Sequence, residues 1–158
     1  MGDVSIRSAR AEDREALVAL WLDLVEHHRR LGTADAPAPS LRAALAEELA
    51  RGIARERCRV LVAERDGAHV GFLFAEVEPA GRAGEPPAAG WIHELWVVPG
   101  ERRNGIAAAL VREADAFFAA RGVRRVSVRV ESANADALEY WARRGFVERA
   151  RVLERLSD

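Results

Sequence analysis

The chain has no lysine, and all 24 of its Lys/Arg positions are arginine. This absence excludes a Walker-type phosphate loop, a lysine Schiff base and a lysine general base, since each of these needs the ε-amine. A phosphate-binding site in this chain must therefore rely on main-chain amides and arginine.

Cysteine and histidine are also scarce. Cys58 is the single cysteine, so no internal disulfide can form, and the four histidines have no zinc-ligand spacing. Cys58 stands in the apolar run CRVLVAE, which favours a packed thiol over a nucleophile. We expect no metal site.

The charges balance, and long apolar runs are missing. A formal net charge of −1 argues against a broad nucleic-acid footprint, which requires a clustered basic surface. No apolar run approaches the roughly 18 to 20 residues of a membrane span. The N-terminal stretch MGDVSIRSARAED lacks the apolar segment of a signal peptide. We expect a cytoplasmic protein with one domain over residues 3–158 and no nucleic-acid or membrane partner.

Apolar periodicity and turn residues predict a mixed α/β domain with the order β-α-α-β-β-β-α-β-α-β. Asp66-Gly67 is a dipeptide preferred in two-residue hairpin turns, so it is expected to join two strands. The expected strands are residues 4–8, 58–65, 69–78, 91–98, 123–130 and 146–156, and the expected helices are residues 11–31, 41–54, 105–120 and 134–144.

The stretch WVVPGERRNGIAAAL has the pattern of an anion site. A buried strand breaks at a Pro-Gly turn and a helix begins near Gly105, where unpartnered N–H groups and the helix dipole favour negative charge. Alanines at 107–109 permit close approach, and Arg102 and Arg103 add charge at the rim. The pattern by itself fits an ordinary strand-turn-helix with solvated arginines equally well.

Residues 97–107 resemble the phosphate-binding loop of the GNAT superfamily of acyl-CoA N-acyltransferases. A second match supports the resemblance, because Asn134, Ala137, Gly145 and Phe146 fit the family's later helix-to-strand motif at the expected offsets. The element order agrees as well, so the chain is identified as a member of the superfamily over nearly its whole length.

The resemblance implies a mixed sheet whose two central strands splay apart, flanked by about four helices, with acetyl-CoA as co-substrate. An N–H near Val97 would polarise the thioester carbonyl. Asn134 would contact the cofactor arm, although a helix N-cap is an alternative role for it. By resemblance the pantetheine arm pairs with the main chain of Leu95, Trp96 and Val97, and the pyrophosphate lies against the loop of Arg102, Arg103, Asn104, Gly105, Ile106, Ala107 and Ala108.

The implied reaction is direct transfer of an acetyl group to an amine, which requires a base. Glu94 is favoured over His93, and the alternative is that both residues only line the cleft or bond locally. Strand alternation sends these neighbours to opposite faces unless a bulge intervenes, and it likewise separates Trp91 from Trp96.

The family's general acid is a tyrosine seven residues after the motif asparagine, and this chain has Trp141 there. Tyr140 is one residue earlier and points about 100° away on a helix. Three outcomes stay open: a rotated helix brings Tyr140 in, water protonates the thiolate, or the thiolate leaves without a dedicated acid. We favour the last two. The Trp141 indole can at most donate a hydrogen bond to the sulfur.

The acceptor is expected to be a primary amine of a small molecule or peptide. The alternative is a catalytically weak acyl-CoA-binding module, because the tyrosine is displaced and the base is uncertain. A homodimer is expected by family analogy alone. Candidate acceptor-site residues are Trp21, Glu26, His27, His28 and residues 80–89. Trp21 is expected in the core. His27 and His28 are expected to be solvated residues near a helix end.

Overall fold

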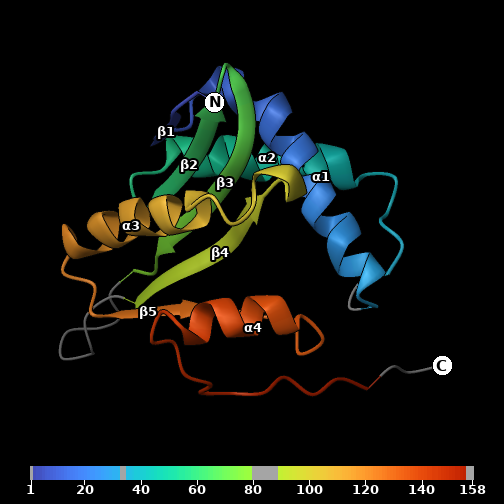
Figure 1. Ribbon diagram of the computed structural model, residues 1–158. Coiled ribbons are helices and arrows are strands. Elements are labelled where there is room, and N and C mark those ends of the chain that lie inside the picture. The colour runs from blue at the N-terminus through green and yellow to red at the C-terminus, as the bar shows by residue number, and fades with distance from the viewer. Residues whose placement is uncertain (1, 33–34, 80–88, 156–158) are drawn as a thin grey trace.

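The protein contains a five-stranded sheet with the strand order β1-β2-β3-β4-β5 (Figure 1). The computed structural model describes residues 2–32, 35–79 and 89–155. Strands β1 to β4 are antiparallel neighbours, whereas β5 runs parallel to β4. The strands are β1 (Val4–Ser8), β2 (Cys58–Arg65), β3 (Ala68–Val77), β4 (Ala89–Val97) and β5 (Arg125–Val128).

The helices lie within a few residues of their predicted positions, and the α/β fold class is confirmed. The predicted hairpin is present, with positive φ angles of 51° at Asp66 and 79° at Gly67, as its turn requires. The helices are α1 (Arg14–Arg30), α2 (Leu41–Ala54), α3 (Ile106–Ala119) and α4 (Ala135–Ala142), with short 3₁₀ turns η1 (Ala11–Asp13) and η2 (Pro99–Glu101).

Each face of the sheet is covered by its own apolar cluster. Helices α1 and α2 pack on the face that carries Phe72, Phe74 and Trp96. Helix α3 packs on the opposite face, against Leu73 and Ile92, and Trp141 of α4 joins this second cluster. The two clusters hold β4 between them, which positions the site described below.

The expected splay of the central strands is confirmed. Residues Ala89–Ile92 of β4 pair with Arg125–Val128 of β5, and the pairing ends there. The β5 side of β4 is therefore open from His93 onward.

A bulge in β4 alters the predicted orientation of its side chains. Ala75 pairs with Ile92 and Phe74 pairs with Glu94, so His93 is an extra residue. The register shift places Trp91, His93, Glu94 and Trp96 on the α1/α2 face of the sheet, and His93 contacts Phe74 there. The expectation that Trp91 and Trp96 lie on opposite faces is therefore wrong, because the bulge adds one residue to the alternation.

The predicted last strand is absent from the described residues 146–155. Its large apolar residues after Phe146 are solvent-exposed, at 73% for Val147, 67% for Val152 and 92% for Leu153. Figure 1 shows this segment running below α4 toward the C-terminus. A strand needs a neighbouring edge for its backbone hydrogen bonds, and the alternation of residue types could not supply one.

An ion-pair network joins β1, β2, β3 and η1. The Arg7 guanidinium binds both oxygens of buried Asp13, at 2.7 and 2.8 Å, and also contacts Glu64. His69 Nε2 lies 2.9 Å from Asp13 Oδ1. Asp13, Glu64 and His69 have the residue types and proximity of a metal site. Because Arg7 already compensates both carboxylates, we interpret the cluster as a structural ion-pair network.

Cys58 is buried in the α1/α2 cluster as expected, and burial raises the pKa of its thiol.

Of the helices in the described part of the chain, none combines the length and apolarity that a bilayer span requires.

Candidate active site

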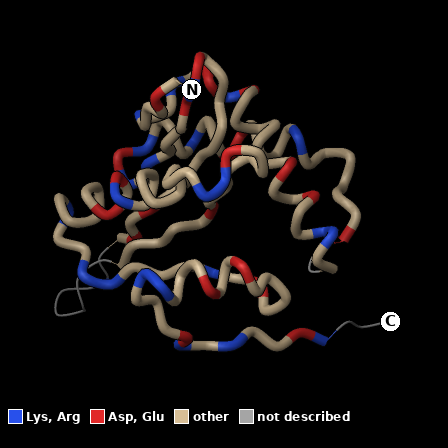
Figure 2. The backbone as a smooth tube through the Cα atoms, in the orientation of Figure 1, with Lys and Arg blue, Asp and Glu red and all other residues tan. Residues whose placement is uncertain are grey.

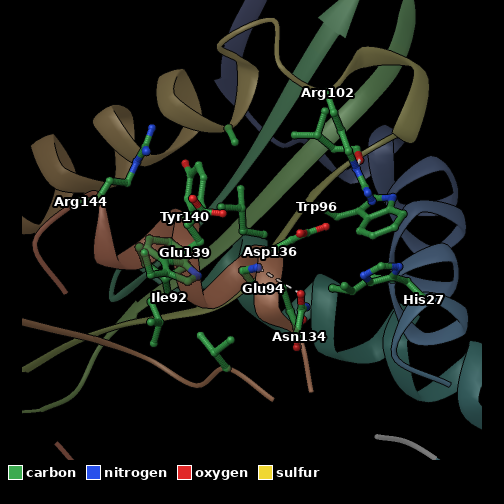
Figure 3. A pocket seen from close by; sticks show the side chains of 18 of the residues that line it. His27, Ile92, Glu94, Trp96, Arg102, Asn134, Asp136, Glu139, Tyr140 and Arg144 are labelled. Carbon is green, nitrogen blue, oxygen red and sulfur yellow. Dashed lines mark hydrogen bonds between the residues drawn. The ribbon is translucent and has the colours of Figure 1, made fainter. Parts of the chain in front are cut away.

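A cavity of about 790 Å³ opens where β4 and β5 separate. It extends from the end of α1, past β4, to the start of α3 and along α4 (Figure 3). Every predicted catalytic and cofactor-binding residue except Asn104 lines this cavity. The side chain of Asn104 instead lies near Glu101, with Nδ2 3.5 Å from Oε2.

The open edge of β4 turns main-chain polar groups toward the cavity. Val98 donates its N–H to the carbonyl of Val70 on β3, at 3.0 Å. Since successive residues of a strand direct their polar groups to alternate sides, those of Val97 and Leu95 face away from β3. Arg102 confirms this direction, because its Nε donates to the carbonyl of Val97 across 3.0 Å. The main-chain groups of Trp96 face β3, and its side chain lines the cavity.

The N-terminus of α3 forms the far end of the cavity and has no side-chain cap. Its N-cap, Gly105, adopts the left-handed conformation with φ of 77°. The first intrahelical bond there runs from the N–H of Ala109 to Gly105, so the N–H groups of residues 106–108 have no intrahelical acceptor. These free N–H groups, with Arg103 beside them, face the cavity at the positive end of the helix dipole, an arrangement that favours an anionic ligand.

Glu94 is the carboxylate at the centre of the cavity (Figure 3). Burial, with a smaller contribution from the negative charge of Glu48, raises the pKa of Glu94 to about 7. A carboxylate with this pKa can both accept and release a proton near neutral pH.

His93 is more exposed and already has a partner. Its Nε2 lies 2.9 Å from Oε2 of Glu76, and Glu76 in turn pairs with Arg57 at 3.1 Å. The imidazole stacks nearly parallel to Trp91, with an interplanar angle of 8°. His93 and Glu94 therefore lie on the same face, and one ring nitrogen of His93 is engaged.

Asn134 caps α4, because its Oδ1 accepts the N–H of Ala137 at 3.1 Å (the dashed line in Figure 3). The residue also lines the cavity. The cap engages the amide oxygen, and the amide nitrogen is the group that can donate to a ligand.

Tyr140 and Trp141 both border the cavity, although they are oriented differently. Trp141 is buried against Phe146, with ring centroids 4.9 Å apart. The Tyr140 ring lies under the guanidinium of Arg144, and its buried hydroxyl has no hydrogen-bond partner among the described residues. Burial raises the pKa of Tyr140, which makes it a weaker proton donor.

The end of α1 forms a wall of the cavity. His27 and His28 both line it, and the His27 ring lies 5.3 Å from that of Trp96, whose other neighbour is the Arg102 guanidinium at 4.6 Å. Burial lowers the pKa of both histidines. Both histidines lie in the last turn of α1 as expected and are only half-buried, so they remain partly exposed while they border the cavity.

Two further acceptor candidates, Trp21 and Glu26, do not line the cavity. Trp21 packs against Phe72 and Phe74 in the core as expected, and Glu26 pairs with arginines on the exposed side of α1. Residues 80–88 lie outside the described residues, so the segment predicted there is not placed.

Sequence patterns missed several charged residues of the cavity. None of these residues stands at a quoted motif position, so only the fold places them at the cavity. They carry both signs of charge, as the colours along α4 in Figure 2 illustrate. The missed residues are Glu101, Arg129, Glu131, Asp136, Glu139, Arg143 and Arg144.

The chain belongs to the acetyltransferase (GNAT) family, whose sequence profile matches residues 21–146. An uncharacterised N-acetyltransferase of Methanocaldococcus jannaschii is 33% identical over 95 residues, which is 60% of this chain and 42% of that protein. This chain therefore matches less than half of that relative.

Solved structures share the fold at low sequence identity. The aminoglycoside N-acetyltransferase AAC(6')-Iy in complex with CoA has a TM-score of 0.79 and 18% identity, covering 99% of this chain and 96% of that chain. A predicted acetyltransferase from Clostridium acetobutylicum, solved with acetyl-CoA, has a TM-score of 0.75 and 16% identity, covering 98% of this chain and 96% of that chain. Both similarities extend over the whole domain.

Proposed function

We propose that this protein transfers an acetyl group from acetyl-CoA to a primary amine of a small molecule or peptide. The observation that carries the proposal is one continuous cavity with three parts. It joins the open edge of β4, the uncapped N-terminus of α3 and the carboxylate of Glu94. The CoA and acetyl-CoA complexes of the structural relatives support this co-substrate.

In the proposed complex the pantetheine arm extends the sheet at the open edge of β4, pairing with the main chain of Leu95 and Val97. The pyrophosphate binds the free N–H groups of residues 106–108, with charge supplied by Arg102 and Arg103. Arg102 now donates to the carbonyl of Val97, so it must release that carbonyl when the arm pairs there.

In the proposed reaction the acceptor nitrogen attacks the thioester carbonyl carbon within a ternary complex. A C–N bond forms, the C–S bond breaks, and the main-chain N–H of Val97 stabilises the oxyanion. The ammonium proton passes to Glu94, directly or through ordered water. The thiolate leaves and takes a proton from water, since the Tyr140 hydroxyl is buried and its pKa is raised.

Tyr140→Phe tests this last step. We expect turnover to fall by less than about tenfold, because general-acid catalysis contributes roughly 10²–10⁴-fold where it operates. A hundredfold fall in turnover with unchanged acetyl-CoA affinity would assign the general acid to Tyr140.

The second candidate function is an acyl-CoA-binding module with little turnover. The displacement of the phenol from position 141 to position 140 favours it. Titration calorimetry with CoA and acetyl-CoA tests both functions, because no binding at millimolar ligand contradicts each of them. A thiol-release assay over a broad panel of amines, peptides and aminoglycosides separates them. Only the enzyme releases CoA from acetyl-CoA faster than the uncatalysed hydrolysis of the thioester.

The proposal extends to a homodimer. In the described part of the chain, all the exposed large apolar side chains lie on α4 or after it: Leu138, Val147, Val152 and Leu153. Among the described strands, none pairs with the outer edge of β5. A second copy of the chain would cover both features at once.

A further inference from the structure

Glu101 places a negative charge in the region where the proposed function places a pyrophosphate. It ends η2, one residue before Arg102, and lines the cavity together with the first turn of α3. An uncompensated carboxylate at this position would repel an anionic ligand.

Arg65 compensates this charge from a distant part of the sequence. It is the last residue of β2, and its Nη1 forms an ion pair with Oε2 of Glu101. The two side chains are 11% and 23% exposed, so solvent screens the pair only partly. Glu101 lies near the end of β4, and this contact therefore joins the β2–β3 hairpin to the loop that precedes α3.

The loop beside this pair has an unfavourable backbone conformation. Arg103 has a φ of 65°, in the left-handed region that residues with a Cβ rarely adopt, and Gly105 follows with 77°. These two residues lie on either side of Asn104, whose amide also reaches Glu101 at 3.5 Å. Glu101 therefore contacts Arg65 on one side and the strained turn on the other.

We propose that Arg65 is a positioning residue for the cofactor loop: it neutralises Glu101 and keeps that carboxylate paired, so that the loop presents a net positive field to an anionic co-substrate. This inference rests on the proposed function, because it concerns the same loop. Arg65 acts through Glu101 and the loop, without contact to the reacting atoms.

The role in charge compensation has a signature that a purely structural ion pair lacks. If the pair served stability alone, removing either partner would weaken CoA binding to a similar extent. If Arg65 compensates Glu101, only its own removal exposes a carboxylate to the ligand. Removing Glu101 as well should then restore binding.

The test measures CoA affinity by calorimetry for Arg65→Gln, Glu101→Gln and the double variant. We expect Arg65→Gln to weaken binding by about tenfold or more, and Glu101→Gln to stay within about threefold of the parent. The double variant should return to the level of Glu101→Gln. In turnover assays, Arg65→Gln should raise KM for acetyl-CoA and leave kcat within about twofold.

Arg59→Gln is the matched control, since Arg59 is on the same strand and outside the cavity. Arg65→Met, which keeps the aliphatic stem, replaces Arg65→Gln if that variant does not fold. Equal losses for the two single variants, or a double variant as weak as Arg65→Gln, would overturn the inference. A parent protein that does not bind CoA would instead contradict the proposed function.

Discussion

The environment of Glu94 determines its chemistry. A carboxylate in water has a pKa near 4 and is a poor proton acceptor at neutral pH. Burial in the cavity raises the pKa of Glu94 to about 7, close to the optimum for a general base. His93 is the neighbour with the more familiar base chemistry, yet its Nε2 is engaged by Glu76.

We therefore expect Glu94→Gln to lower kcat by about 10²–10⁴-fold, the usual contribution of a positioned base. CoA affinity should not change, because the pyrophosphate site lies at the other end of the cavity. His93→Gln is the matched control, and steady-state kinetics should show a change of less than about tenfold. Loss of turnover in His93→Gln, with Glu94→Gln still active, would transfer the base to His93.

The pH dependence of kcat gives a second test at the residue scale. Glu94 must be ionised to accept a proton, so kcat should rise with pH through about 7. The negative charge of Glu48 raises this pKa, and Glu48→Gln should therefore lower it and move the acidic limb to lower pH. The shift should be less than about one pH unit, because burial is the larger cause. Glu47→Gln, one residue away on α2, is the control, and an unmoved limb in Glu48→Gln would contradict the coupling.

The sequence motifs named segments that the structure brings together around one cavity, because motif positions identify main-chain segments. The loop at 102–108 and the open edge at 95–97 need only a turn and a strand to be in place. The sequence alone does not predict the orientation of His93 relative to Glu94, since a bulge is a property of strand pairing and has no signature in WIHELWV. The charged partners Arg65 and Glu101 are 36 residues apart, and only the fold brings them together.

At the scale of elements, the predictions succeeded where a segment buries one face. Helix α3 shows this, because Ile106, Leu110, Ala114 and Phe117 follow the helical repeat and all lie in the core. The predicted strand at 146–156 failed because its alternation has no buried face among the described residues. Periodicity describes what a segment can bury, and the rest of the fold decides whether a partner is present.

The ion-pair network of Arg7 should stabilise the contact among η1, β1 and β2. The Arg7 guanidinium lowers the pKa of Asp13 far below its usual value. A carboxyl with a lowered pKa stabilises the fold above its unfolded pKa of about 3.9, and this contribution is lost as the pH falls below that value. Asp13→Asn should cost about 3 kcal/mol at pH 7, as for other broken buried pairs.

Urea denaturation at pH 7 and pH 3 checks this prediction. The difference in free energy of unfolding between parent and Asp13→Asn should shrink at the lower pH, where the parent begins to lose the same interaction. Glu12→Gln is the control, since that neighbouring carboxylate is exposed. A difference that does not depend on pH would show that packing, and not the ion pair, accounts for the loss.

At the scale of the whole molecule, the absence of lysine restricts both the composition of the proposed anion site and the choice of acceptor. The proposed anion site is built from main-chain amides and arginines, and the carboxylate of its loop is paired with an arginine. The chain also offers no side-chain amine as an acceptor. Under the proposed function the acetyl group must therefore pass to another molecule or to the N-terminal amine.

The exposed apolar side chains after α4 lead to the last prediction. Burying Val152 and Leu153 against a second copy would contribute about 1.5–3 kcal/mol for each side chain. We expect size-exclusion chromatography with light scattering to give twice the chain mass of 17.4 kDa for the parent protein. The double substitution Val152→Asp and Leu153→Asp should give the single mass, because it places charge in the apolar contact. Ala43→Asp, on the exposed side of α2, should keep the dimer. A parent protein of single mass at high concentration, or a dimer that persists in the double variant, would show that this surface does not mediate self-association.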